Sequence, residues 1–349
     1  MRNRIFWIDC AKFISIFGIV FAHLIEQNVV YNYICSFNIS IFFLLSGYTF
    51  SVKNIDSFTK VFVNKVKRIM MPYFTFAIGS YFIYLLIGSF VARDLIGDKA
   101  RTLSNGRLLF GVFYGNSRDM LMKFNEPLWF LPCLFCVSII TYFIIKKRDD
   151  NKYLLLMIVV LMLLTFIYDK FLNSIIFPWG LDSAIPMTIF FILGYLFKKN
   201  YTNIMGNLNK TMIFMLSIIS MIAGIILFNY NISVSVAHCR YGNLFIFFFS
   251  GIVSCFGYLL MAHLIPKNKI IEKLGQSTLI ILVIHKFLVI VCKIKLEFVK
   301  EWIEVHNYFG IALTAFIIIL ICVLIGEIIL KIFPPFLGQD LKKVRRIEE

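Results

Sequence analysis

The sequence predicts an all-α integral membrane protein, with about ten transmembrane helices in one bundle and both termini in the cytoplasm. Of its 349 residues, 60% are hydrophobic and only 15% are charged. Apolar residues also come in runs long enough to cross about 30 Å of hydrocarbon as helices. Soluble domains are nearer half apolar and a quarter charged. The aromatic content of 17% excludes an intrinsically disordered chain.

Ten apolar runs are candidate membrane spans, and their order defines the expected fold. They cover residues 5–25, 33–52, 72–90, 128–145, 153–168, 177–197, 212–228, 244–264, 277–291 and 309–330. Since no polar segment is long enough for a soluble domain, we expect one membrane domain, residues 1–335, followed by a short basic cytoplasmic tail, residues 336–349.

The loops predict the orientation of these spans. The segments expected in the cytoplasm are all basic, as the positive-inside rule requires, and cover residues 53–71, 146–152, 198–210, 266–273 and the tail. The external loops 27–32, 169–176 and 229–243 are poor in Lys and Arg, whereas 91–127 and 292–308 carry both signs. The net charge of +16 therefore faces lipid headgroups, and we expect no nucleic-acid partner. The expected location is the inner, cytoplasmic membrane of the cell.

The eight cysteines do not predict a disulfide scaffold, because most lie in or beside apolar runs. Cys133 and Cys136 form a CxxC pair without the second pair of ligands that a zinc site needs. Cys35 and Cys239 fall on the same predicted side of the membrane and could pair, but we do not expect this bond.

Charged groups inside hydrocarbon are costly, so the first span carries the strongest functional signal. Lys12 and His23 are eleven residues, about three helical turns, apart, which places them on one face and roughly 16 Å apart along the axis. Asp9 and Glu26 extend the same stripe. Asp9 with Lys12 is either a snorkelling ion pair or part of a site. His23 is either a packed interfacial residue or a general base. Glu26 either orients the imidazole ring or is a carboxylate in water at the rim of the membrane.

The ninth span places His285 and Lys286 side by side, about 100° apart around a helix. We therefore expect one of them to face the interior while the other packs against a neighbouring helix. Functional and structural interpretations of this pair stay equally open.

Three short motifs complete the set. In IFFLLSGY, residues 41–48, Gly47 predicts close helix packing. In KVKRIMMPYF, residues 65–74, Lys65 and Arg68 are either topology signals or ligands for an anionic nucleotide. In EPLWFL, residues 126–131, Trp129 suits an interfacial belt.

These motifs, in this order and closed by GQSTLIILVIH at residues 275–285, resemble the acyltransferase 3 family of multi-spanning membrane acyltransferases, particularly its polysaccharide and fucose O-acetylase-like members. The resemblance implies transfer of an acyl group, usually acetyl, from a cytoplasmic CoA thioester to a hydroxyl of an extracytoplasmic glycan or lipid-linked sugar. His23 matches the family's essential histidine, and Lys12 and Arg68 match its basic positions. Glu126 stands where many members have histidine, and Lys286 is an unusual neighbour for His285.

The expected catalytic residues are His23, as base, and Lys12, as a charge that orients donor or oxyanion. Expected donor- or acceptor-binding residues are Asp9, Lys65, Arg68, Glu126, Trp129 and His285. We expect no metal and no permanently bound cofactor, but acyl-CoA, most simply acetyl-CoA, as cosubstrate. A transporter or flippase of lipid-linked saccharides is the alternative, since ten spans and buried charges would serve it too.

Overall fold

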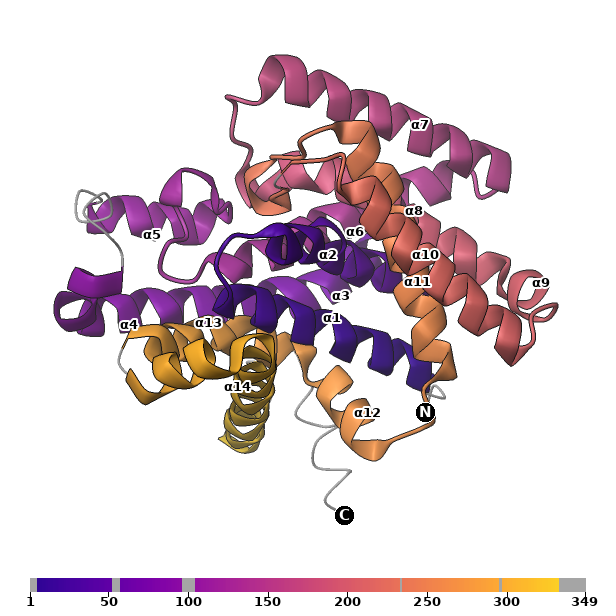
Figure 1. Cartoon of the computed structure of the whole chain (residues 1–349). Coiled ribbons are helices and arrows are strands. Elements are labelled where there is room, and N and C mark those ends of the chain that lie inside the picture. Colours follow the sequence, from indigo (N-terminus) through magenta and orange to yellow (C-terminus); the bar gives the residue numbers. More distant parts are fainter. Residues whose placement is uncertain (1–4, 52–56, 96–103, 233, 295–296, 333–349) are drawn as a thin grey trace. The chain divides into compact units, whose positions relative to one another are not determined.

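The computed structural model describes residues 5–51, 57–95, 104–232, 234–294 and 297–332. Helices form almost all of this part of the chain (Figure 1), and its single β-bridge joins Ser235 and Arg240 within one loop. The predicted all-α class is therefore confirmed. All eight cysteines lie in the described residues and are free thiols, so Cys35 and Cys239 are not bonded to each other.

Nine helical segments of the described chain are long and apolar enough to cross a membrane, and the bent pair α12–α13 would make a tenth. This multi-pass architecture confirms the predicted span count. The longer helices are α1 (Phe6–Leu24), α2 (Val29–Thr49), α4 (Met71–Leu95), α6 (Phe130–Lys147), α7 (Asn151–Ile167), α8 (Leu181–Lys199), α10 (Lys210–Phe228), α11 (Leu244–Leu264), α13 (Thr278–Ile294) and α14 (Glu297–Ile332). The shorter ones are α3 (Phe58–Lys65), α5 (Asn105–Tyr114), α9 (Tyr201–Met205) and α12 (Lys269–Gln276). The sidedness of the spans remains a prediction from the basic loops.

Polar residues just before the helices explain where many of them begin. An Asn, Ser or Asp side chain accepts a hydrogen bond from a backbone N–H of the first turn, which satisfies a donor that the helix itself leaves unpaired. The residues that do this are Asn28, Ser57, Ser104, Asp150, Asn209, Asn243 and Asn268.

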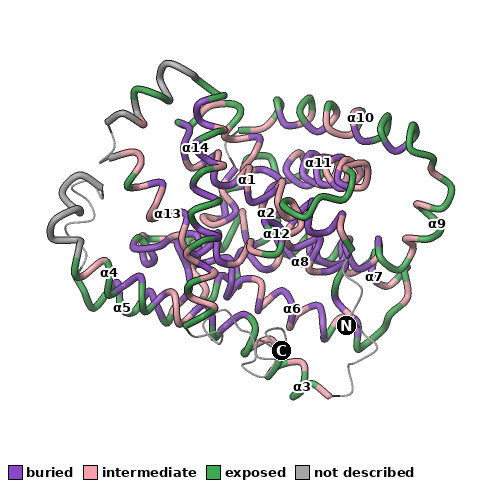
Figure 2. The backbone as a smooth tube through the Cα atoms, turned by 90° about the horizontal axis from the view of Figure 1, so that it is seen from below, coloured by how far each residue is buried: buried purple, intermediate pink, exposed green. Residues whose placement is uncertain are grey.

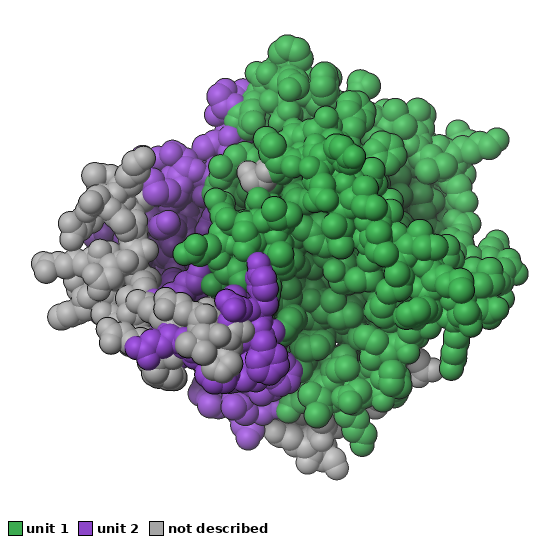
Figure 3. Space-filling view, viewed as in Figure 1, with its two compact units in different colours: residues 1–52, 140–173, 185–278 green, residues 53–139, 174–184, 279–349 purple. Residues whose placement is uncertain are grey.

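The chain falls into two compact units, which Figure 3 shows in different colours. Unit 1 comprises residues 1–52, 140–173 and 185–278, and unit 2 comprises residues 53–139, 174–184 and 279–349. Within unit 1, α1 packs against α2, α11 and α12, and α10 runs along α11. Much of α10 is exposed (Figure 2). Its exposed side chains are mostly apolar, as expected for a helix that faces lipid.

Gly47 lets α2 and α8 cross at close range, as the sequence predicts. A Cβ at Gly47 would lie 1.9 Å from the carbonyl oxygen of Phe191, and one at Gly194 would lie 1.8 Å from that of Leu44. The two contacts are reciprocal, so small residues on both helices bring the backbones together.

Unit 2 contains helices inside two segments that the sequence predicts to connect spans. In the segment 53–71, the described chain is helical from Phe58, through a π-helical turn at Val66–Met70, into α4. In the segment 91–127, α5 packs along α4. There the Tyr73 hydroxyl donates to the Val112 carbonyl (2.6 Å) and the Tyr81 hydroxyl to that of Asn105 (3.2 Å).

Candidate functional site

Asp9 and Lys12 form the predicted ion pair in the first turns of α1. Lys12 Nζ lies 3.6 Å from Asp9 Oδ1, and the two side chains are 31% and 9% exposed. Gly275 of α12 packs directly on this turn, because a Cβ there would lie 2.0 Å from the Asp9 carbonyl oxygen. Asp9 is therefore set into the interior of unit 1, where a carboxylate without the partly exposed Lys12 beside it would be strongly destabilising.

His23 lies in the last turn of the same helix and is half-buried. Since α1 is continuous from Phe6 to Leu24, its rise places His23 roughly 16 Å along the axis from Lys12, as predicted. The expected position of Glu26 on this stripe is wrong. The helix ends at Leu24, Ile25 has extended backbone angles, and Glu26 is exposed beyond it.

An aromatic cluster, not predicted from the sequence, surrounds the other end of α1. Trp7 stacks on His263 of α11 with ring centroids 4.1 Å apart. The Nδ1–H of His263 donates to the Leu259 carbonyl (2.8 Å), so its Nε2 accepts from the hydroxyl of Tyr201 (3.2 Å). Burial raises the pKa of the Tyr201 phenol, which keeps this donor protonated at neutral pH. The cluster fixes the helix end that carries Asp9 and Lys12.

Lys65 and Arg68 lie on the helical segment that leads into α4. Lys65 is half-buried at the end of α3, whereas Arg68 is exposed in the π-helical turn. They are three residues apart and close enough to interact electrostatically. π-Helical turns are rare and are frequent at functional sites. The two predicted cations thus form one cationic patch at an irregular turn.

The predicted residues of EPLWFL lie in unit 2 in a different setting from the one expected. Trp129 is only 5% exposed, so it does not belong to an interfacial belt. Glu126 is half-buried in the short 3₁₀ turn Glu126–Trp129. This turn leads directly into α6.

On α13, His285 is the residue that faces the interior. It is fully buried, and its Nδ1–H donates to the Ile281 carbonyl (2.8 Å). Lys286 is half-buried and interacts electrostatically with Glu126 and Lys123. The structure therefore brings Glu126 and Lys286 into one neighbourhood.

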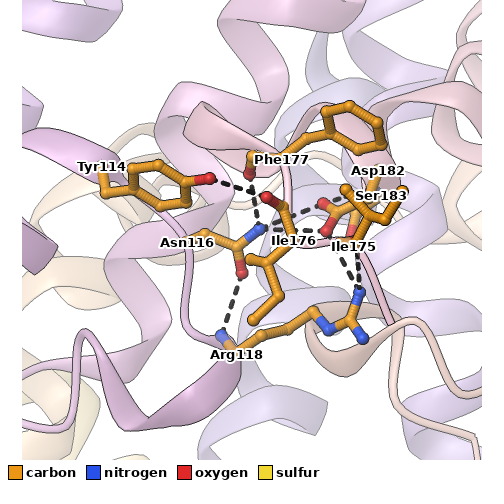
Figure 4. A network of polar contacts seen from close by, with 8 residues as sticks. All are labelled: Tyr114, Asn116, Arg118, Ile175, Ile176, Phe177, Asp182 and Ser183. Atoms are coloured by element: carbon orange, nitrogen blue, oxygen red, sulfur yellow. Dashed lines mark hydrogen bonds and ion pairs between the residues drawn. The ribbon is translucent and has the colours of Figure 1, made fainter. Parts of the chain in front are cut away.

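A buried polar network in unit 2 was missed by the sequence analysis (Figure 4). The carboxylate of Asp182 is 3.4 Å from Arg118 Nη1, and it accepts from the Asn116 amide at 3.1 Å and from the Ser183 N–H at 2.9 Å. Its side chain is fully buried, and that of Arg118 is 14% exposed. The network ties the segment after α5 to the first turn of α8 and the residues just before it. The signal available in the sequence was one aspartate at the start of an apolar run, with no indication of its partner.

Strained backbone conformations occur in the same two segments. Among the non-glycine residues of the described chain, Asp119, Met120 and Trp179 have positive φ angles of 55°, 58° and 59° there. The Trp179 indole N–H donates to the Phe113 carbonyl (3.0 Å), which adds a further tie between the segments. Such strained conformations persist only where surrounding contacts impose them.

Comparison with known proteins decides the family. The family model described as an acyltransferase domain, Acyl_transf_3, matches residues 5–330, nearly the whole chain. The chain belongs to the acyltransferase 3 family. It is therefore a membrane O-acyltransferase, as the motifs indicated. No curated protein and no solved structure gives a significant match.

In this acyltransferase, six of the eight predicted site residues fall into three local groups, and Trp129 and His285 are buried separately in unit 2. Asp9, Lys12 and His23 lie on α1 in unit 1. In unit 2, Lys65 and Arg68 form the second group, and Glu126 lies near Lys286 in the third. No cluster of three His, Cys, Asp or Glu side chains that could hold a metal ion occurs among the described residues.

Proposed function

We propose that this acyltransferase moves an acyl group, most simply acetyl, from cytoplasmic acyl-CoA to a hydroxyl of an extracytoplasmic or lipid-linked glycan. The main support for this proposal is the set of ionisable residues on α1. One apolar helix holds an ion pair of a buried Asp9 and a half-buried Lys12 in its first turns, and a half-buried histidine in its last turn. Ionisable groups are costly in such a helix and mark functional positions.

His23 is the general base in this proposal. Its imidazole takes the proton of the acceptor hydroxyl while the hydroxyl oxygen attacks the thioester carbonyl. The tetrahedral intermediate then collapses, the carbon–sulfur bond breaks, and the proton on His23 passes to the sulfur of the leaving CoA. The products are an O-acyl ester and CoA thiol, so atoms and protons balance.

Lys12 acts on the donor rather than on the reacting carbonyl. Roughly 16 Å of helix separates it from His23, which is too far for one ammonium group to touch an oxyanion formed beside the imidazole. We therefore propose that Lys12, held by Asp9, orients the donor, while Lys65 and Arg68 bind the phosphates of CoA through charge-assisted hydrogen bonds.

Purified protein in liposomes tests this function. With labelled acetyl-CoA and extracted envelope glycan, we expect label to appear in ester linkage that mild alkali releases. Liposomes without the protein are the control. Transport of labelled lipid-linked sugar with no acyl transfer would contradict the proposal.

A further inference from the structure

Asn125 is a buried side chain whose amide nitrogen makes hydrogen bonds, whereas its amide oxygen makes none among the described residues. It is fully buried between α4 and α13, and its Nδ2 donates to Ser80 Oγ (3.0 Å) and to the Val283 carbonyl (2.9 Å). Because a carbonyl oxygen can only accept, the second bond fixes which end of the amide carries the nitrogen. The position of Oδ1 follows from these two bonds.

Oδ1 of Asn125 is a buried acceptor with no hydrogen-bond partner in the described chain. Rotation of the amide would not satisfy it, since that would break both bonds of Nδ2. Ser80, which accepts from Asn125, is also buried, and its own O–H still has a hydrogen to donate. One fixed acceptor and one available donor thus lie side by side.

Lys286 adds a cation to this neighbourhood. It lies three residues after Val283, so both residues are on the same face of α13, one turn apart. Lys286 and Glu126 are half-buried, whereas Asn125 is fully buried. The two charged residues provide further hydrogen-bond donors and acceptors in the neighbourhood of this amide.

We propose that Asn125, Ser80 and Lys286, with Glu126, form a subsite for a neutral polyhydroxyl group, the sugar of the acceptor. A sugar hydroxyl is both donor and acceptor, so it can donate to Asn125 Oδ1 while a neighbouring hydroxyl accepts from Lys286. The carboxylate of Glu126 offsets the charge of the half-buried Lys286, and the second cation, Lys123, is exposed and screened by solvent, so a neutral ligand is favoured over an acidic one. The assignment of this ligand to the acceptor rests on the proposed function.

Sugar binding to the full chain in detergent tests the subsite without relying on activity. The probes are the methyl glycosides of glucose, galactose and N-acetylglucosamine, with glucuronate as the acidic comparison, and the readout is the shift in Tm. Lys286→Met is the main variant, because it removes the ammonium group but no hydrogen bond of the described chain. Lys123→Met is the matched control, since Lys123 is an exposed cation in the same neighbourhood.

We expect at least one methyl glycoside to raise Tm, and Lys286→Met to weaken this binding about tenfold or more, the scale of one charged hydrogen bond. Lys123→Met should bind as the wild type does, and Lys286→Arg should recover part of the loss. No shift with any glycoside, equal shifts in the wild type and Lys286→Met, or binding of glucuronate alone would overturn the subsite.

Transfer kinetics separate this inference from the proposed function. In an active protein, Lys286→Met should raise the KM for glycan by about tenfold more than the KM for acetyl-CoA. Equal changes in both constants would contradict the subsite. If the protein binds glycosides through Lys286 but transfers no acyl group, the subsite stands and the proposed function fails.

Discussion

Each of two buried acidic side chains, Asp9 and Asp182, has a cationic partner within its own unit, Lys12 and Arg118 respectively. The first pair was predictable because its members are three residues apart on one helix. The second was not, because 64 residues separate Arg118 from Asp182 and only the fold brings them together. Local spacing identifies partners on one helix, whereas partners on different segments require the three-dimensional structure.

Transfer activity should depend on the positive charge at position 12 rather than on the shape of the side chain there. We expect Lys12→Arg to keep most of the transfer activity, since it preserves the partner of Asp9, and Lys12→Ala to lose much more. Initial rates with labelled acetyl-CoA measure both variants. Equal losses in the two would show that the ammonium group itself, not its charge, is required.

The two arginine–aspartate pairs of unit 2 should differ in their contribution to stability. Arg118→Ala leaves the buried Asp182 without its cation, and breaking a buried pair costs about 3–5 kcal/mol. Arg107→Ala is the matched control, because Arg107 and Asp119 are an exposed pair, worth about 0–1 kcal/mol. Thermal unfolding in detergent compares them. A smaller Tm loss for Arg118→Ala than for Arg107→Ala would contradict the structural role of the network.

At the scale of elements, hydropathy predicted the spans well because lipid requires about 20 apolar residues in each helix that crosses it. It did not predict α5, whose ten residues are too few to span and which packs against α4 through tyrosine hydroxyls. Hydropathy also does not predict the helical segment from Phe58, because basic residues interrupt its apolar pattern. Amphipathic and short helices carry no such length requirement, so hydropathy alone does not identify them.

The cationic patch at the π-helical turn should act on donor binding. Replacing Lys65 and Arg68 together by Gln should raise the apparent KM for acetyl-CoA more than it lowers kcat, because charge-assisted contacts to phosphates are lost. Lys60→Gln with Lys67→Gln, two exposed cations of the same segment, is the control. An unchanged KM in the folded double variant would leave Lys65 and Arg68 as topology signals only.

For the whole molecule, the family and the span count followed from the sequence, whereas the division into two units did not. The first two depend on local motifs and composition. The units instead combine segments that are distant along the chain, and their boundaries fall inside α6 and α8. Such long-range packing leaves no periodic signal in the sequence.

The orientation of the whole molecule is tested by reporter fusions. A reporter at Asn28 should read as external and one at Lys147 as cytoplasmic, because the basic loops are expected inside. Periplasmic and cytoplasmic reporters at both positions give the answer. The reverse pattern at both would overturn the predicted sidedness of every span.

Acyl transfer by the His23→Ala variant tests the central claim most directly. The measurement is the initial rate of labelled acetyl transfer to glycan by purified protein in liposomes. His23→Gln is a second variant, and His238→Ala, which changes a histidine of the connection between α10 and α11, is the control. We predict that both His23 variants insert and fold normally but lose roughly 100-fold or more of the rate, the scale of a lost general base, while His238→Ala does not. Near-normal transfer by folded His23→Ala would contradict the account and make His285 the next candidate for the base.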